Sequence, residues 1–219
     1  MTTFQRARSE EQRAVRRQAI LDTAAAMLTE QPVAELTLNE LSRRVGLAKS
    51  NVLKYFESRE AVLLELFGYE FDAWVEDLRA ALRGVKGRSG QRGELLVDAV
   101  VRTLAARPVF CDLIGAQAAV LERNISTEVA LSFKRSALRG YQALLTVVVE
   151  AVPQVSVEGA SRFISSASML AGAIWTHAHP TPAIQAAYDA DPDLAAIRLD
   201  FESSLREALT TILYGILPR

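Results

Sequence analysis

Apolar residues recur every three or four positions along almost the whole chain, and no stretch alternates with period two for long enough to form a β-strand. The clearest stripe consists of Leu63, Phe67, Phe71, Trp74, Leu78 and Leu82. This stripe predicts one helix of about 24 residues, roughly 36 Å long. We therefore expect an all-α fold of about nine helices with no sheet.

Prolines and glycines divide this pattern into segments. Pro32, Pro108 and Pro153 each stand where an apolar stripe stops, because proline cannot continue the helical hydrogen-bond ladder. The glycine-rich residues 84–93 and the proline-containing residues 179–192 predict loops. The predicted helices cover residues 10–30, 38–45, 49–56, 59–82, 95–106, 109–122, 126–151, 156–177 and 193–214.

The second and third predicted helices are short and separated by a tight turn. Thr37 is a good N-cap with Glu40 three residues later, which is the spacing of a capping box. Gly46 can take the left-handed conformation that lets a chain leave one helix and enter another within a few residues. Residues 37–59 are therefore predicted to form a helix-turn-helix.

The second helix of this pair divides into two faces. Val52, Leu53 and Phe56 are the expected apolar anchors, whereas the other face is basic or hydrogen-bonding. That polar face consists of Lys49, Ser50, Asn51, Lys54 and Tyr55. A helix with such a division can lie in the DNA major groove while its back packs on a scaffold.

Residues 16–67 resemble the N-terminal helix-turn-helix of the tetracycline-repressor (TetR) family of bacterial regulators. The resemblance rests on the threonine-led entry at Thr37, Gly46 in the turn and the segment 49–56, and it continues through residues 58–64. The family usually has a tyrosine that contacts the DNA backbone where this chain has Leu53. Lys54 and Tyr55 are the neighbouring candidates for that contact.

The resemblance implies a DNA-binding domain over residues 1–60 and a ligand-binding and dimerisation domain over residues 61–219. It implies a homodimeric repressor that binds a near-palindromic DNA operator and is released by a small-molecule effector; activation in place of repression stays open. We expect Asn51 to read base edges, because an amide offers a donor and an acceptor together. Lys49, Ser50 and Tyr55 would enter the groove with it, and Thr37, Lys54 and Arg59 would bind phosphate.

Aromatic and polar residues within the otherwise aliphatic helices are candidates for an effector site. They are Trp74, Phe110, Gln117, Asn124, Tyr141, Trp175 and His177. Pockets are typically apolar with a few placed polar groups, which favours a largely apolar or aromatic ligand. Core packing or an exposed surface position is the alternative for each residue.

The last two long predicted helices carry apolar stripes that favour a dimer interface. The candidate residues are Phe163, Ala167, Leu170 and Ile174 in the first helix, and Phe201, Leu205, Leu209 and Ile212 in the second. Two such helices from each of two chains can form a four-helix bundle. The alternative is an ordinary core within one chain.

Composition narrows the protein class. Residues 1–60 carry 10 Lys/Arg against 8 Asp/Glu, whereas the whole chain has a formal net charge of −1, so it is not a basic coat for nucleic acid. Cys111 is the single cysteine, which excludes an intrachain disulfide and fits a reducing cytoplasm. No apolar run approaches the ~20 residues of a membrane span, and we expect a cytoplasmic protein with no membrane partner.

Support for catalysis is slight, and no catalytic residue, metal site or cofactor is predicted. There is no glycine-rich phosphate loop, nucleophile elbow or metalloprotease motif. His177 and His179 are two apart and do not share a helical face, so they could bind a metal only if the loop brought Asp189, Asp191 or Asp193 to them. That metal-dependent enzyme stays an alternative, as does a helical ligand-binding or adaptor protein that has lost DNA binding, which Leu53 motivates.

Overall fold

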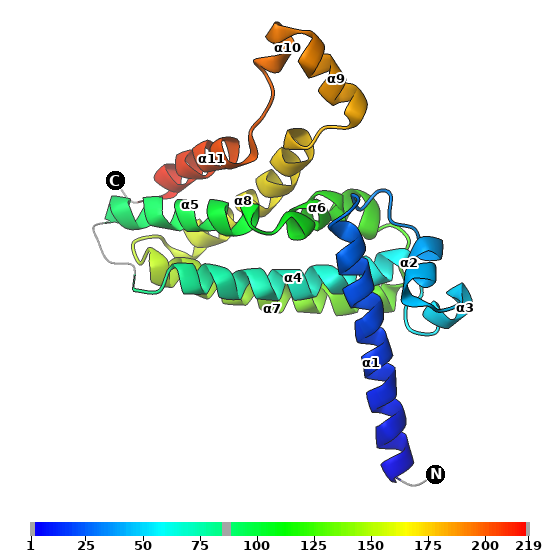
Figure 1. Ribbon diagram of the computed structural model, residues 1–219. Helices are drawn as coiled ribbons and strands as arrows, with labels where there is room; N and C mark the ends of the chain where they lie inside the picture. Colours follow the sequence, from blue (N-terminus) through cyan, green and yellow to red (C-terminus); the bar gives the residue numbers. More distant parts are fainter. Residues whose placement is uncertain (1–2, 85–88, 218–219) are drawn as a thin grey trace. The chain divides into compact units, whose positions relative to one another are not determined.

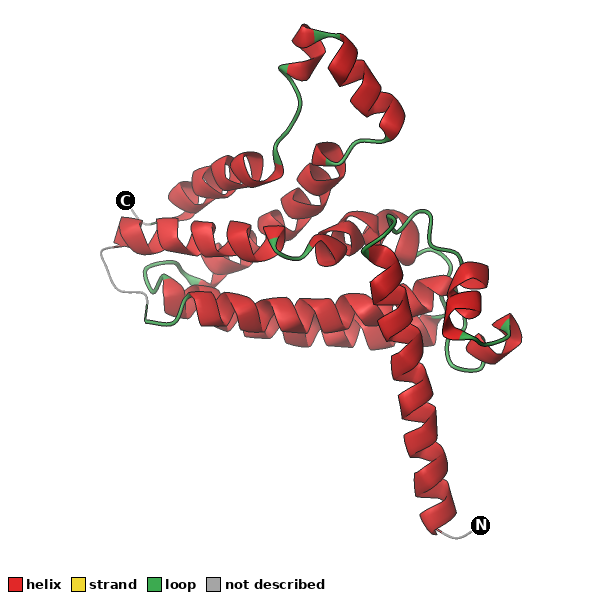
Figure 2. Cartoon of the chain, viewed as in Figure 1, coloured by secondary structure: helices red, strands yellow, loops and turns green. Residues whose placement is uncertain are grey.

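The computed structural model describes the backbone of residues 3–84 and 89–217, and within these the side chains of residues 10–84 and 91–217. Every regular element in this part of the chain is a helix (Figures 1 and 2). The helices are α1 (Thr3–Leu28), α2 (Leu38–Val45), α3 (Lys49–Val52), α4 (Arg59–Ala81), α5 (Ser89–Ala105), α6 (Pro108–Ala116), the π-helix η1 (Gln117–Leu121), α7 (Thr127–Ala151), α8 (Val157–Ala178), α9 (Pro182–Ala190), α10 (Pro192–Ala195) and α11 (Phe201–Ile216). The prediction of an all-α fold is confirmed.

Several predicted boundaries are wrong, and the largest error concerns residues 179–192. Pro182 and Pro192 do not only interrupt helices there; each is the first residue of a new one, α9 and α10. Proline is well suited to that position, because its missing N–H would have had no partner and its φ is already helical. As a result α11 begins at Phe201, later than the predicted start at residue 193.

Three other boundaries also differ from prediction. Helix α1 begins at Thr3, before the predicted residue 10, and α5 begins at Ser89, inside the predicted loop 84–93, of which residues 85–88 lie outside the described residues. The predicted helix 109–122 changes from α-helical to π-helical geometry at Gln117. Short π-helical segments are uncommon and frequently occur at functional sites.

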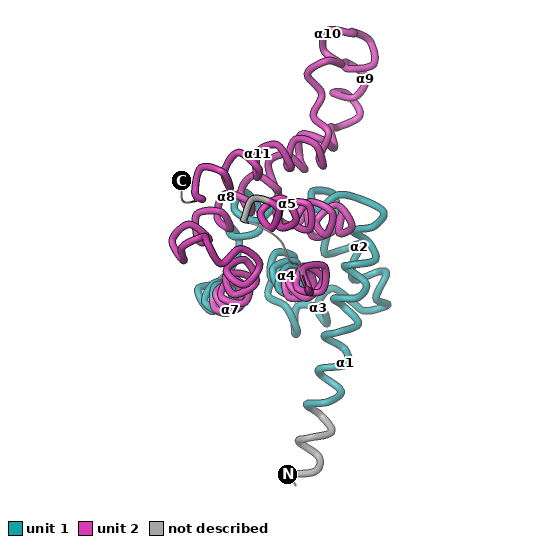
Figure 3. The backbone as a smooth tube through the Cα atoms, turned by 90° about the vertical axis from the view of Figure 1, so that its left-hand side faces the viewer, with its two compact units in different colours: residues 1–69, 116–134 teal, residues 70–115, 135–219 magenta. Residues whose placement is uncertain are grey.

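The chain folds into two compact units, shown in different colours in Figure 3. Unit 1 comprises residues 1–69 and 116–134, and unit 2 comprises residues 70–115 and 135–219. Helices α4 and α7 each contribute residues to both units. This division follows packing; the predicted functional boundary at residue 60 stays a prediction.

Unit 1 has a core built from α1, α2, the segment around α3 and the start of α4. Its buried side chains include Ile20, Ala24, Met27, Leu36, Leu41, Val52, Phe56 and Leu63. Phe133 of α7 belongs to the same unit and meets the edge of the Phe67 ring, with 5.6 Å between ring centroids. Burial of this apolar surface is what orders the two short helices α2 and α3, which could not be stable alone.

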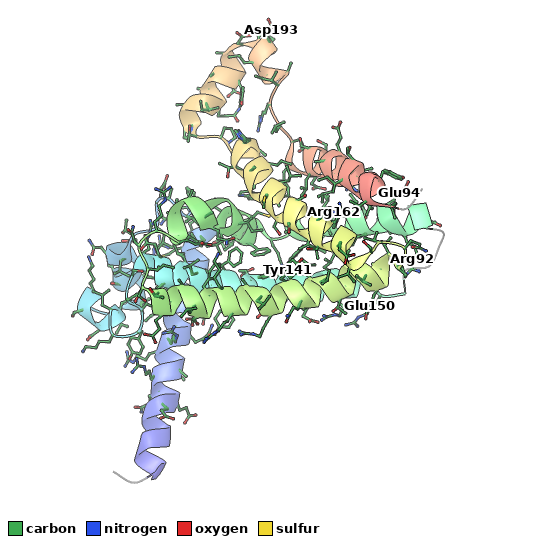
Figure 4. All side chains as sticks on the ribbon, turned by 180° about the vertical axis from the view of Figure 1, so that it is seen from behind. Arg92, Glu94, Tyr141, Glu150, Arg162 and Asp193 are labelled. Atoms are coloured by element: carbon green, nitrogen blue, oxygen red, sulfur yellow. The ribbon has the colours of Figure 1, made fainter. Side chains whose placement is uncertain are left out.

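In unit 2, α11 packs against both α8 and α5 (Figure 1). Helices α6 and α8 approach so closely at Gly115 and Gly172 that a Cβ on Gly115 would lie 2.8 Å from the Thr176 hydroxyl oxygen. Arg92 donates to the backbone carbonyls of Glu150 (2.9 Å) and Ala151 (2.7 Å), which closes the C-terminus of α7 (Figure 4).

By length and hydropathy, none of the described helices could cross a membrane alone. One pair, residues 91–105 and 108–121, meets those criteria together but is bent by 91°.

Candidate nucleic-acid interface

Helix α2 has the ends that its sequence predicts. The Thr37 hydroxyl oxygen accepts a hydrogen bond from the Glu40 N–H at 3.2 Å, and Gly46 has φ 74°, in the left-handed region. The Leu47 N–H closes the turn by donating to the Ser42 carbonyl at 3.0 Å. A glycine is needed at this one turn position because a Cβ would be strained there.

The Glu40 carboxylate does not complete the capping box in its usual form. It accepts hydrogen bonds from the side chains of Arg43 and Arg44, which lie one turn later on α2. The hydrogen bonds from these two arginines lower the pKa of the Glu40 carboxyl group to about 2. The Arg44 guanidinium also donates to the Glu30 carboxylate at 2.6 Å, so this cluster connects α2 to the turn after α1.

The predicted second helix, residues 49–56, is shorter than expected. Helix α3 ends at Val52, and the chain continues in a tighter turn in which the Tyr55 N–H donates to the Val52 carbonyl at 2.9 Å. Val52 and Phe56 are buried, as predicted for the anchoring face. Leu53 is 43% exposed, so its prediction as a third anchor is wrong. The turn after Val52 leaves the Leu53 side chain facing away from the core.

The exposed side of this segment carries the predicted polar residues. Lys49, Ser50 and Lys54 are exposed, and Asn51 and Tyr55 are half-buried. The Lys54 ammonium donates to the Asn51 side-chain oxygen at 2.9 Å. Among the described residues the Asn51 amide nitrogen has no acceptor, so it is available as a donor. We call residues 49–55 the reading segment.

Arg17 of α1 contacts the C-terminal end of the reading segment and holds it in place, a role that the sequence did not indicate. Its guanidinium lies over the Phe56 ring, 4.1 Å from the ring centroid, and donates to the Tyr55 carbonyl. It also forms an ion pair with Glu65 of α4, with Nε 2.9 Å from Oε1. One side chain therefore joins α1, the end of the reading segment and α4.

Two predicted phosphate-binding residues already have structural partners. The Thr37 hydroxyl caps α2, and the side chain stays exposed. The Arg59 guanidinium donates to the Leu36 carbonyl at 3.0 Å and pairs with Glu60 at 3.1 Å. Arg59 therefore fixes the start of α4 to the loop before α2.

Residues 116–134 of unit 1 contact the chain directly after the reading segment. The Glu57 carboxylate accepts a hydrogen bond from the Ser126 N–H at 2.6 Å, which lowers the pKa of Glu57. Gln117 of η1 donates to Glu122 at 2.8 Å, and Glu122 pairs with Lys134 at 2.8 Å. Asn124, predicted with Gln117 as a ligand residue, is exposed in the same segment.

The structure brings two of the predicted ligand residues together in unit 2. The rings of Trp74 and Phe110 lie 5.8 Å apart, and Phe71 lies 6.0 Å from each. The Trp74 indole N–H donates to the Thr103 hydroxyl at 2.9 Å. A Cβ on Gly140 would come within 2.6 Å of the Phe71 ring, so α7 packs directly on this aromatic cluster of Phe71, Trp74 and Phe110.

The other predicted ligand residues of unit 2 occupy different places. Tyr141 bonds Ser161 at 2.5 Å and lines an open groove of about 540 Å³ between α7 and α8, beside Arg162 (Figure 4). Trp175 contacts His179, with 3.8 Å between ring centroids, and His177 is exposed. His177 therefore lies on the surface, and Tyr141 is half-buried where it lines the groove.

The predicted dimer residues lie mainly inside the single chain, where α8 packs on α11. Phe163, Ala167, Ile174, Phe201, Leu205 and Leu209 are buried, and Leu170 and Ile212 are half-buried. The outward side of α8 presents instead Ser165, Met169 and Ala173, with Met169 74% exposed. The dimer interface stays a prediction for these two helices.

Residues considered for catalysis or metal binding show other environments. Cys111 is fully buried with its sulfur 3.3 Å from the Leu104 carbonyl, and burial raises its pKa to about 12, so a reactive thiolate is not favoured. The His179 ring nitrogen Nδ1 lies 2.9 Å from the Trp175 carbonyl. The described residues contain no group of three or more His, Cys, Asp or Glu placed to hold a metal.

Together, the capped α2, the glycine turn and an exposed polar segment with buried anchors define a helix-turn-helix DNA-binding regulator. Two family models match the chain. Residues 20–66 match the bacterial regulatory proteins of the tetR family, and residues 69–219 match the tetracyclin repressor-like C-terminal domain. The chain therefore belongs to the TetR family of transcriptional regulators, as its sequence indicates.

Solved structures with the same fold include the fatty acid degradation regulator FadR from Bacillus halodurans (18% identity, TM-score 0.54, 92% of this chain and 99% of that chain covered). A TetR transcriptional regulator from Rhodococcus sp. RHA1 is 16% identical, with a TM-score of 0.56 and coverage of 93% and 96%. The TetR family repressor AlkX from Dietzia sp. strain DQ12-45-1b, implicated in biodegradation of n-alkanes, is 16% identical, with a TM-score of 0.51 and coverage of 92% and 97%. These identities support the fold alone. Comparison with the curated proteins finds no match.

Proposed function

We propose that this protein is a cytoplasmic, homodimeric repressor that binds a near-palindromic operator and is released by a small, largely apolar effector. The observation that carries the proposal is the reading segment. Lys49, Ser50 and Lys54 are exposed on a stretch whose Val52 and Phe56 are buried anchors. A rigidly anchored polar segment is what insertion into a major groove requires, because the groove must meet side chains in fixed positions.

Within this proposal, Asn51 reads a base and Lys54 binds phosphate. The Asn51 oxygen now accepts from Lys54 at 2.9 Å. On DNA, a phosphate would take the Lys54 ammonium and free both groups of the amide for a bidentate pair with adenine. Lys49 has no ion-pair partner among the described residues and would enter the groove beside Asn51, with Ser50 and Tyr55. Thr37 and Arg59, at the two ends of the helix-turn-helix, would bind phosphate and so fix the register of the protein on the DNA.

Selection of bound sequences from a random duplex pool tests this assignment. We expect an inverted repeat with half-site centres about one helical turn, ~34–36 Å, apart. Asn51→Ala is expected to relax one position in each half-site and leave the others unchanged. An unchanged preference in the variant would show that Asn51 is not a reader, and a pool with no enrichment would contradict the operator-binding function itself.

The effector would enter unit 2 at the aromatic cluster. Phe71, Trp74 and Phe110 contact one another, and a bound apolar molecule would have to move at least one of these rings. The similar structures named for fatty acid degradation and for n-alkane biodegradation suggest a fatty acid and an n-alkane as probes. By linkage, operator DNA must lower the affinity of the protein for the probe by the same factor by which the probe lowers its affinity for the operator.

Dimerisation would use the sides of α8 and α11 that the chain's own core leaves open. Ser165, Met169 and Ala173 of α8 are exposed there, and Ile212 of α11 is half-buried. Small residues let helices approach closely, as a four-helix bundle needs. The predicted residues Phe163 and Leu205 would support this interface by fixing α8 against α11.

A second candidate function is a helical ligand-binding or adaptor protein that no longer reads DNA. The observation in its favour is Leu53, an aliphatic side chain 43% exposed in the middle of the reading segment. Leu53→Tyr distinguishes the two functions. Operator affinity that appears only in this variant would favour the adaptor, whereas operator binding by the natural chain excludes it.

A further inference from the structure

Helices α9 and α10 form an arm, residues 181–199, that connects α8 to α11. In the views of Figures 1 and 3 the arm stands away from the other helices of unit 2, and Asp193 marks its tip in Figure 4. The two helices pack against each other, and neither contains a buried residue. A folded segment of this kind has surface available for a partner on nearly all sides.

Local sequence starts both helices but cannot stabilise them. Pro182 and Pro192 stand at the first helical positions, and the Asp191 carboxylate accepts from the Asp193 N–H at 2.9 Å. The helices have nine and four residues. Isolated helices shorter than about 12–15 residues are marginal in water, so the arm needs a surface to pack on.

The arm carries apolar side chains that such a surface would cover. Ile184 is 49% exposed, Ile197 67% and Leu199 40%. Leu194 is 39% exposed, in a helix with no buried residue. Four large aliphatic side chains left open on one short segment are typical of an interaction site rather than of a solvated loop.

Charge indicates which surface fits. The arm as defined, residues 181–199, carries Asp189, Asp191 and Asp193 against a single basic residue, Arg198, so acidic charge predominates; the three carboxylates are exposed and have no cation partner among the described residues. On α7, Arg135 and Arg139 are exposed on either side of Leu138, which is 55% exposed. Neither arginine pairs with an acid in the part of the chain that the structure describes. The spacing of three and four residues places all three on one face of α7, the α7 face.

We propose that the arm of each chain packs on the α7 face of a second copy, with its aspartates against Arg135 and Arg139 and its aliphatic side chains around Leu138. The two surfaces are complementary in both charge and hydropathy, and both occur on every chain. When each of two copies packs its arm on the α7 face of the other, the two contacts are equivalent and form a closed, twofold-symmetric dimer. The inference rests on the proposed homodimer: the arm leaves α8 and returns to α11, whose outer sides would already face the second copy.

Cross-linking between separately prepared variants tests the contact. Cys111 is buried, so an added surface cysteine is the accessible thiol of each variant. We expect Ile197→Cys and Leu138→Cys chains, mixed and treated with a short bis-maleimide, to give a cross-linked pair, since a link between different variants must join two chains. Ile197→Cys mixed with Val15→Cys, 65% exposed on α1, is the control and should give no such pair. Equal yields in both mixtures, or no yield with Leu138→Cys, would overturn the proposal.

A charge exchange tests its energetics. Asp189→Arg with Asp193→Arg, which keeps the Asp191 cap, should raise the dimer Kd about tenfold or more, because like charges then face each other. Arg135→Glu with Arg139→Glu should do the same. A mixture of the two variants should form heterodimers with a Kd within about threefold of the natural chain. Variants that dimerise like the natural chain would overturn the arm contact alone, whereas a natural chain that is monomeric by sedimentation at micromolar concentration would overturn the homodimer as well.

Discussion

The reading segment and the arm are both built on short helices, yet their surroundings are opposite. Helix α3 has only four residues, but Val52 within it and Phe56 just after it are buried in the chain's own core. Helix α9 has nine residues and none is buried. The comparison shows that length does not decide whether a short helix is stable: the apolar anchors on its flank do.

The difference also separates two ways of presenting a surface. In the reading segment the apolar anchors are buried in the core of the chain, and the polar residues Lys49, Ser50 and Lys54 are exposed and can contact a partner. In the arm the apolar residues Ile184 and Ile197 are themselves exposed. A surface of the first kind suits DNA, which is polar and charged, and a surface of the second kind suits another protein.

Removing an anchor of the reading segment should have the largest effect. Phe56→Ala deletes a buried ring on which Arg17 lies, and the free energy of unfolding is expected to fall by about 3–5 kcal/mol. Leu53→Ala, at an exposed neighbouring position, should change it by no more than about 0.5 kcal/mol. Urea unfolding of both variants checks this. Similar losses in the two variants would mean that the reading segment is not anchored as described.

Loss of the Arg17 contacts should be next in size. Arg17→Met keeps the apolar stem but removes the hydrogen bond to the Tyr55 carbonyl and the ion pair with Glu65. We expect a loss of about 1–3 kcal/mol, because the half-buried partners lose their hydrogen bonds. The matched control is Arg16→Met, at an exposed position on the same helix. If the Arg16 variant lost as much stability, general helix propensity and not the Arg17 contacts would be the cause.

A smaller and more selective effect is expected for Lys54. Lys54→Ala should leave folding unchanged and weaken binding to all DNA sequences alike, since phosphate contacts carry no sequence information. The slope of log affinity against log salt concentration should become shallower by about one unit. Lys134→Ala, which breaks a pair with Glu122 outside the reading segment, is the control. A loss confined to some sequences would show that Lys54 reads bases.

The smallest effect concerns the pH dependence of stability. Because Arg43 and Arg44 lower the pKa of Glu40 from 4.5 to about 2, the folded state favours the ionised carboxylate. Its contribution is fully present above the unfolded value and is lost as the pH falls from 4.5 toward 2. The free energy of unfolding of Glu40→Gln should therefore lie below that of the natural chain at pH 6, and the difference should narrow as urea unfolding is repeated down to pH 3. A constant gap would contradict the link between Glu40 and the two arginines.

Patterns that depend on neighbours in sequence were enough to predict the helix-turn-helix. The Thr37 cap, the Gly46 turn and the Val52 and Phe56 anchors are each set by spacing within about two helical turns. The same reasoning failed for Leu53, which follows the buried Val52 directly, so that its side chain lies about 100° around the helix axis from that anchor. Phe56, about one turn after Val52, returns to the buried face.

Contacts between distant parts of the chain could not be predicted. Arg17 lies 38 residues from Tyr55 and 48 from Glu65 in sequence, and nothing in its local pattern distinguishes it from Arg16. Likewise, the stripes containing Phe163 and Leu205 indicated a buried interface, but a stripe does not say whether its partner is the same chain or a second one. Here α8 and α11 bury these residues against each other.

The central claim is that a dimer holds two anchored reading segments at a fixed spacing, and changing the distance between half-sites tests it most directly. Starting from the selected operator, we would insert about 5 base pairs, half a helical turn, between the half-sites and measure affinity. Our account predicts that binding falls to the level of a single half-site and recovers partly at about 10 inserted pairs. Affinity that does not depend on the insertion would contradict it, because it would mean that each half-site is read independently.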